Sequence, residues 1–215
     1  MAEKELDPNV ILEAEFEYIA TTATQSNEDR AKVTSFYFVT VGSLLAAIFG
    51  AQYIEELNNA GGDPRTVYWG FSLLFFVLTI LGYLTVAQLA RLRTAWRESV
   101  HAMNVIKEYY VKELDRNLDQ AFLWKTGTIP PAYKPGSVAN FLVHEVTILD
   151  GLIFSAAIFF ALLGLGFEDV IQNLLVSVIV GILMWQGQYY LYKRSLAKHN
   201  LLEMPDESDT VQSKT

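Results

Sequence analysis

The segment from Phe16 to Gly50 reads FEYIATTATQSNEDRAKVTSFYFVTVGSLLAAIFG and decides the fold. Its first half is polar and rich in carboxylates, whereas its second half is apolar. From Val33 to Ile54 the chain has no charged side chain over about 22 residues, and roughly 20 residues suffice for an α-helix to cross a bilayer. We therefore predict a cytoplasmic helix that leads into a first transmembrane span.

The cytoplasmic helix is predicted from the spacing of apolar residues. Leu12, Phe16, Ile19 and Ala23 recur every three or four residues, which places them on one face of an amphipathic helix. Asp7 followed by Pro8 is a typical helix start, with Asp as the N-cap and Pro in the first turn.

Three further apolar segments follow, at residues 66–89, 138–167 and 170–192. The segment 66–89 ends without a helix breaker, and apolar residues continue beyond it at heptad spacing. We expect it to run on into the cytoplasm as one helix, to about Phe122. The residues expected to make contacts along this extension are Leu92, Trp96, Met103, Ile106 and Tyr110.

The predicted fold is therefore all-α, a polytopic membrane protein with four transmembrane helices and a cytoplasmic helical layer. The predicted parts are a cytoplasmic helix (1–31), a first hairpin (32–89, spans 33–54 and 66–89), a cytoplasmic helix and linker (90–136), a second hairpin (137–194, spans 138–167 and 170–192) and a disordered tail (195–215).

The distribution of charge predicts the topology. Arg65 is the one basic residue in the two loops that follow the first and third spans. By the positive-inside rule, both termini are expected in the cytoplasm and the protein in the cell inner membrane. The acidic N-terminal segment lacks the pattern of a signal peptide, so none is expected.

Composition and motifs exclude several classes of function. The net charge is −8, which argues against a nucleic-acid partner, and with no cysteine there is no thiolate chemistry. Motifs of metalloproteases, serine hydrolases and nucleotide-binding loops are missing from the sequence. We predict no catalytic residue, no cofactor and no metal site, and thus not an enzyme.

Two patterns suggest how copies could associate around a pore. Gly42, Ala46 and Gly50 form a small-residue stripe that allows close helix packing. The polar residues before the first span would then ring a cytoplasmic vestibule that favours cations. Alternatively, Glu28 and Asp29 pair within the chain with Arg91, Arg93 or Arg97, which are otherwise interpreted as headgroup contacts. The predicted vestibule residues are Gln25, Asn27, Glu28 and Asp29.

Asp150 is the one acid placed to lie inside the hydrocarbon region. A carboxylate there costs about 2.5–3.5 kcal/mol on insertion scales, so it usually faces a partner or a water-filled path. Asp150 is either a wet residue at the inner interface beside His144 and Glu145, or a pore-lining or proton-accepting group with Thr147 one turn away.

The first half of the chain resembles the SLATT-type bacterial membrane proteins and other four-span bacterial proteins. The resemblance lies in Glu17-Tyr18, in the QxNEDR motif at residues 25–30, and in a two-span hairpin followed by a long helix. It implies an oligomeric pore-forming effector in a nucleotide-signal defence system. This chain differs by its second hairpin and by having no evident nucleotide-sensor domain.

The leading functional hypothesis is a homo-oligomeric channel or pore in the lipid bilayer, gated by a partner or a signal. The alternative is a non-conducting scaffold or accessory subunit of a larger membrane complex, because the same heptad helix and aromatic side chains would serve that role.

Overall fold

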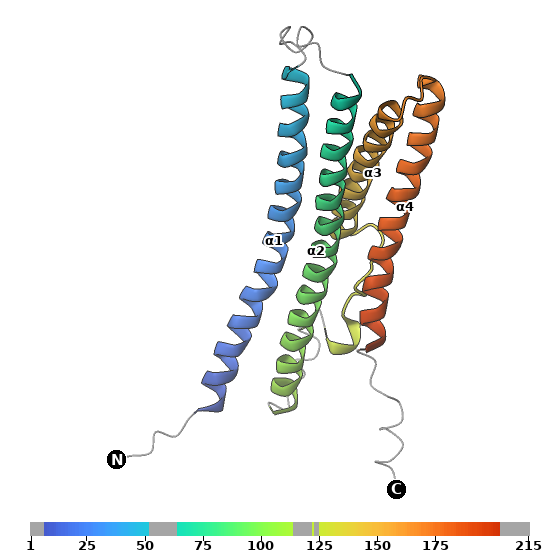
Figure 1. Ribbon diagram of the computed structural model, residues 1–215. Helices are drawn as coiled ribbons and strands as arrows, with labels where there is room; N and C mark the ends of the chain where they lie inside the picture. Colours follow the sequence, from blue (N-terminus) through green and yellow to red (C-terminus); the bar gives the residue numbers. More distant parts are fainter. Residues whose placement is uncertain (1–6, 52–63, 114–121, 123–124, 203–215) are drawn as a thin grey trace. The chain divides into compact units, whose positions relative to one another are not determined.

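The computed structural model describes residues 7–51, 64–113, 122 and 125–202. Four long α-helices account for most of this part of the chain, and it contains no strand (Figure 1). They are α1 (Pro8–Ala51), α2 (Pro64–Glu113), α3 (Val138–Gly164) and α4 (Val170–Leu202), with a short 3₁₀-helix η3 (Thr126–Thr128) between α2 and α3. All four α-helices are long and apolar enough to cross a membrane. The prediction of an all-α, four-span membrane protein is confirmed.

Helix α1 begins where the sequence predicts. The backbone amide of Asn9 donates to the side chain of Asp7 at 2.9 Å, so Asp7 caps the helix. The Thr- and Ser-rich segment that follows remains helical because its hydroxyl groups bond within the helix. Thr22, Thr24 and Ser26 each donate to the backbone carbonyl four residues earlier, at 3.0–3.1 Å. The predicted cytoplasmic helix and the predicted first span are thus one continuous helix of 44 residues.

Helix α2 continues without a break beyond Leu89, as predicted, and is 50 residues long. At 1.5 Å per residue this is about 75 Å, more than twice the roughly 30 Å of a hydrocarbon core. The predicted continuation from Glu113 to Phe122 falls mostly outside the described residues.

The helices α3 and α4 have clear start and stop signals. The Ser137 side chain accepts a hydrogen bond from the Asn140 amide and caps α3. After α3 the chain turns at Gly166, whose positive φ of 90° is one that glycine adopts without strain. The Asp169 side chain then accepts from the Gln172 amide at 3.0 Å and caps α4. Helix α4 extends to Leu202, ten residues past the predicted end of the fourth span at 192.

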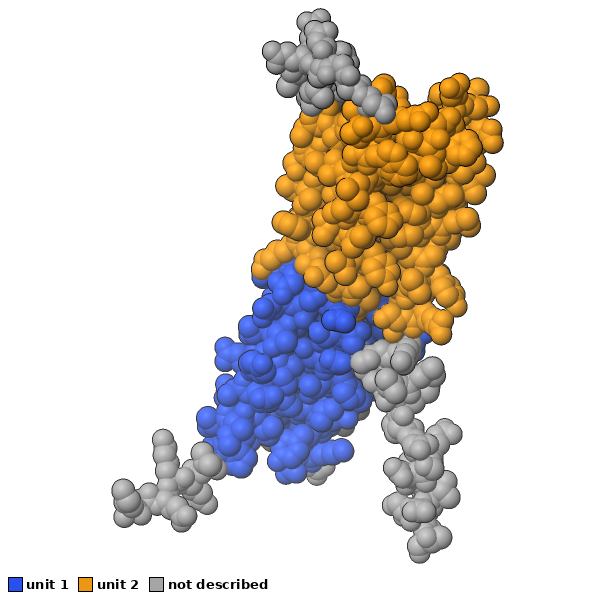
Figure 2. All heavy atoms as spheres, in the orientation of Figure 1, with its two compact units in different colours: residues 1–30, 91–134, 196–215 blue, residues 31–90, 135–195 orange. Residues whose placement is uncertain are grey.

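The chain divides into two compact units (Figure 2). The first unit contains residues 1–30, 91–134 and 196–215, and the second contains residues 31–90 and 135–195. Whether the predicted part boundaries at 31, 89, 136 and 194 mark membrane edges stays a prediction. The second unit holds the apolar segments of all four α-helices and is where the strongest candidate site lies.

Aromatic rings and glycines are among the groups that pack the second unit. Phe160 of α3 lies against Phe71 and Phe75 of α2, with ring centroids 5.1 and 5.8 Å apart. Helices α3 and α4 meet at Gly151 and Gly181, where a Cβ added to Gly181 would lie only 2.5 Å from the Gly151 carbonyl oxygen. Glycines therefore allow a close approach of α3 and α4, whereas an added Cβ at Gly42, on the predicted stripe of α1, would meet nothing within 4 Å.

In the first unit, the end of α2 packs on the linker. Arg93 is only 7 % exposed; its Nε donates to the Ala132 carbonyl at 3.0 Å, and its guanidinium lies 4.5 Å from the Trp96 ring centre. The interpretation of Arg93 as a headgroup contact is therefore wrong, because the side chain is buried and its Nε and Nη2 both donate to backbone carbonyls of the linker. For Arg91 and Arg97 the headgroup contact stays a prediction. Further along, the Thr126 amide donates to Glu108 at 3.0 Å, and hydrogen bonding from Thr126 lowers the pKa of Glu108.

Candidate functional site

A buried carboxylate forms the centre of the candidate site. Asp150 lies near the middle of α3 and its side chain is 0 % exposed. The expectation of a wet side chain at Asp150 is therefore wrong, whereas whether Asp150 lies at the inner interface beside His144 and Glu145 stays a prediction. Glu145 is exposed and His144 is half-buried. Asp150 lies on the inward face of α3 together with Thr147, which is three residues earlier and also fully buried.

The other three α-helices each supply a contact to this carboxylate. Tyr37 of α1 donates its hydroxyl proton to Asp150 Oδ1 at 2.9 Å, and Gln188 of α4 donates an amide proton to Asp150 Oδ2. Helix α2 presents Gly82. A Cβ added there would overlap the Asp150 carboxylate and lie 2.7 Å from the Tyr37 hydroxyl oxygen. We call Tyr37, Gly82, Asp150 and Gln188 the Asp150 node.

The local structure explains why these residues meet. Along α1, Thr34, Tyr37 and Val41 recur at helical spacing, and each is only 2 % exposed. This face of α1 therefore points toward the interior of the second unit. Along α4, Asn173, Ser177 and Gln188 are buried in the same way. Glycine at position 82 leaves the space that the carboxylate and the phenol occupy, which any larger residue would fill.

One buried polar atom of the node, the side-chain oxygen of Gln188, lacks a described hydrogen-bond partner. Gln188 is 2 % exposed, and its Oε1 has no hydrogen-bond partner among the described residues. The contacts described for Asp150 come from a phenol hydroxyl, an amide and a glycine, and none comes from a cation. Within the described ranges no group of three or more His, Cys, Asp or Glu side chains could hold a metal ion. The node is thus a carboxylate held by two hydrogen-bond donors.

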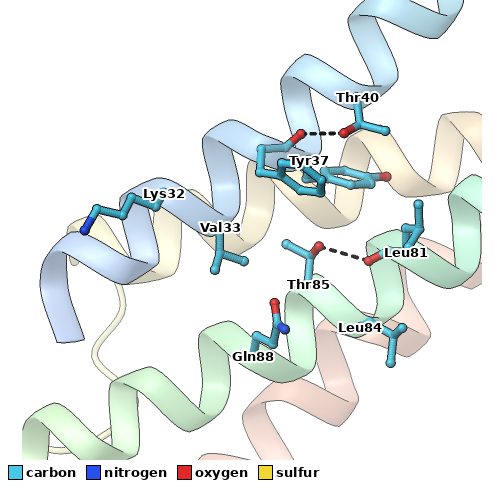
Figure 3. Close-up of a pocket in the computed structure, with 9 residues that line it drawn as sticks. Lys32, Val33, Tyr37, Thr40, Leu81, Leu84, Thr85 and Gln88 are labelled. Carbon is cyan, nitrogen blue, oxygen red and sulfur yellow. Dashed lines mark hydrogen bonds between the residues drawn. The ribbon is translucent and has the colours of Figure 1, made fainter. Parts of the chain in front are cut away.

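A cavity of about 420 Å³ adjoins the node (Figure 3). It lies between α1 and α2, and Tyr37 forms part of its wall. Its polar lining comes from Lys32 and Thr40 of α1 and from Thr85 and Gln88 of α2.

The predicted vestibule residues lie elsewhere. Gln25, Asn27 and Glu28 are exposed on α1 and Asp29 is half-buried; all four belong to the first unit. Asn27 accepts a hydrogen bond from Arg30. Asp150 belongs to the second unit, and none of the four is among its described contacts. Whether they form a vestibule stays a prediction.

The two predicted sets of packing residues differ in burial. Gly42 and Ala46 are exposed on α1, and a Cβ added to Gly42 would meet nothing within 4 Å. The exposure of Gly50 is not among the features that the structure describes. On α2, Ile106 is buried, and the remaining predicted contact residues are half-buried: Leu92, Trp96, Met103 and Tyr110. The most buried positions of this extension are Val100 and Asn104, which the heptad assignment leaves out.

Sequence reasoning selected Asp150 but missed its three partners. Each carries a signal of its own. Gln188 is an amide in an apolar segment, Gly82 lies in the interior of the second span, and Tyr37 lies about one helical turn inside the predicted start of the first span at Val33. These patterns do not indicate that the three residues face one another, because a single sequence does not show which helices pack together.

The fold and the node together define a four-span, all-α membrane protein with a polar centre shared by its four helices. The chain matches no protein-family model, no curated protein and no solved structure.

Proposed function

We propose that the protein conducts ions across the membrane and that conduction depends on Asp150. The observation that carries this proposal is a fully buried carboxylate in the middle of α3, contacted by residues of α1, α2 and α4. A charged group inside a span is costly, and such groups usually belong to ion paths or proton relays. A purely structural tie between helices needs no carboxylate, since a neutral amide or hydroxyl would bond equally well.

The conducting form proposed is a homo-oligomer in the inner membrane with both termini in the cytoplasm. Gly42 and Ala46 are exposed on α1, so this small-residue face is open to a helix of a second copy. Gln25, Asn27, Glu28 and Asp29 would lie at the cytoplasmic mouth, as in the predicted vestibule. The resemblance to SLATT-type proteins supports a pore-forming effector gated by a partner, and no catalytic step is proposed.

Electrical recording tests this function. Purified protein in planar bilayers should carry a current that Asp150→Asn strongly reduces, because asparagine keeps the shape of the side chain and removes its charge. Asp29→Asn should change ion preference or conductance if the vestibule forms. Electrical silence of a correctly assembled wild-type oligomer, over a range of voltages and pH values, would overturn the proposal.

A non-conducting accessory subunit is the second candidate, and the surface of α4 favours it. A row of large apolar side chains is exposed at every fourth position of this helix, with exposed fractions of 58–74 %. Such a row can face lipid or a partner helix. Affinity purification in mild detergent separates the two candidates, because a foreign subunit at fixed stoichiometry favours the accessory role and a pure oligomer favours the channel. The row consists of Ile171, Leu175, Ile179 and Leu183.

A further inference from the structure

We propose that the ion taken up by the Asp150 node is a proton, which reaches the carboxylate from the cavity between α1 and α2 through the hydroxyl group of Tyr37. This inference rests on the proposed function and deepens it by naming the ion and its route. Three features of the second unit carry it: the cavity, the position of Tyr37 and the unsatisfied amide oxygen of Gln188.

The cavity between α1 and α2 is half open to the surroundings, and its mostly apolar lining carries polar groups that can bind water at Lys32, Thr40, Thr85 and Gln88. Its volume is about 420 Å³, and one water molecule takes up about 30 Å³ in the liquid. The exposed residues Lys32 and Gln88 lie toward one end of it (Figure 3). Thr40 and Thr85 donate their hydroxyl protons to the Phe36 and Leu81 carbonyls at 2.8 and 2.9 Å. Their oxygen lone pairs therefore remain available to accept hydrogen bonds from water.

Tyr37 joins the cavity to the carboxylate. Its side chain lines the cavity and is otherwise buried, with 2 % of its surface exposed. Its hydroxyl group is turned away from Lys32 in Figure 3 and donates to Asp150 Oδ1 at 2.9 Å. A phenol can accept a proton on its oxygen while it donates its own proton, so it can serve as one link of a relay.

The surroundings of Asp150 suit a proton better than a metal cation. Tyr37 and Gln188 both direct hydrogen atoms at the carboxylate, whereas a metal cation requires several oxygen atoms directed at it. Helix α2 faces the group with uncharged Gly82, and α4 faces it with the Gln188 amide, so Tyr37 is the one titratable group described in contact with it. A proton requires only one carboxylate oxygen.

Gln188 can satisfy both protonation states. In the state described here its Nε2 donates to Asp150 Oδ2, while its Oε1 is buried without a partner among the described residues. Tyr37 delivers the proton to Oδ1, and a half-turn of the protonated carboxyl group brings the new O–H group to the side of Gln188. The amide can then rotate so that Oε1 accepts this O–H group. The unsatisfied oxygen, otherwise a cost in the folded protein, is then used in the protonated state.

The transfer balances in atoms and charge. A hydronium ion in the cavity gives a proton to the Tyr37 oxygen as the original Tyr37 O–H bond breaks and its proton moves to Asp150 Oδ1. The products are water, neutral Tyr37 and a neutral Asp150 carboxylic acid. The positive charge of the hydronium ion and the negative charge of the carboxylate cancel, and this step loads Asp150 from the side of the cavity.

Infrared spectroscopy and proton flux test the proposal together. On acidification, reconstituted wild-type protein should gain a carboxylic C=O band that is missing in Asp150→Asn. Tyr37→Phe should keep this band at equilibrium but slow its appearance and the proton flux by about a hundredfold or more, since a positioned proton-transfer group typically contributes about 10²–10⁴-fold. Thr85→Leu, which narrows the cavity, should also slow the flux.

Thr79→Val is the matched control. Thr79 is buried in the same unit but donates only to the Phe75 carbonyl of its own helix, so its replacement should leave both band and flux unchanged. A wild-type band that persists in Asp150→Asn, or equal rates in Tyr37→Phe and wild type, would overturn the inference. Currents carried by K⁺ or Cl⁻ without proton flux would overturn it too, while leaving the proposed function intact. With no conduction of any ion, the proposed function fails, and the infrared band still decides whether Asp150 takes up a proton.

Discussion

At the scale of single residues, Gly82 determines how closely the helices can approach Asp150. The absence of a side chain at this position leaves room for both the carboxylate and the Tyr37 hydroxyl group. Gly70, on the same helix, has nothing within 4 Å of an added Cβ. The two glycines therefore form a natural pair for comparison.

Gly82→Ala should lower the free energy of unfolding by about 1–3 kcal/mol, the usual cost of overpacking a core. Gly70→Ala should leave stability unchanged or raise it slightly, because alanine is the better helix former. Thermal unfolding in the same detergent measures both variants. Equal stability of the two would show that the space beside Gly82 is not filled as described.

How much of the site could be predicted from the sequence depends on the kind of residue. Asp150 stands out because a charged residue in an apolar segment violates the hydropathy pattern. Its partners do not stand out, because tyrosine, glycine and glutamine are tolerated in spans for many reasons. Which polar residues meet depends on the rotation of each helix about its axis, and that rotation is fixed by packing between helices.

At the scale of elements, α3 and α4 approach each other closely through glycines. Gly151 and Gly181 allow this approach, with Ser155 of α3 also near Gly181. The sequence predicts close packing on the stripe of α1 instead, because small residues recur there at a spacing of four. A small-residue pattern permits another helix to approach closely. Which helix face packs within the protomer depends on whether a neighbouring helix offers a surface of matching shape.

Gly181→Ala should destabilise the protein by about 1–3 kcal/mol, because the added Cβ would lie against the rigid backbone of α3. Gly187→Ala, on the same helix with open space around it, is the control and should be neutral. Unfolding of both in a denaturing detergent series checks this. A larger effect at Gly187 than at Gly181 would contradict the packing described for α3 and α4.

The bond between Glu108 and Thr126 makes the contact of α2 with η3 sensitive to acid. The pKa of Glu108 is lowered from its ordinary value of 4.5, mainly by hydrogen bonding from Thr126. The contact therefore contributes fully above the unfolded-state pKa and is lost as the pH falls through the lowered value. The amide resonance of Thr126 should shift over that range below 4.5. Glu108→Gln should abolish this shift, and a shift that persists in the variant would assign it to another group.

Most of the elements could be predicted from the sequence, since apolar length and caps determine them locally. Asp7 caps α1 as predicted, α3 begins at the predicted residue 138, and α2 passes Leu89 without interruption. The linker could not be predicted in the same way. Arg93 reaches it across 39 residues of sequence, a contact that depends on folding of the whole first unit.

At the scale of the whole molecule, the orientation in the membrane is open to a direct test. The chain has no cysteine, so single cysteines can be introduced without background labelling. Glu168→Cys should react with a membrane-impermeant thiol reagent from outside intact cells, whereas Ser208→Cys should react only after lysis. The opposite labelling pattern would reverse the predicted topology.

The central claim is that Asp150 is required for ion conduction rather than for folding. The most direct measurement is ion flux per reconstituted protomer in vesicles, compared among wild type, Asp150→Asn and Thr79→Val at matched stability in detergent. We expect wild-type flux with Thr79→Val and background flux with Asp150→Asn. Flux equal to wild type in a correctly folded Asp150→Asn variant would contradict the claim and leave the Asp150 node as a structural tie between the four helices.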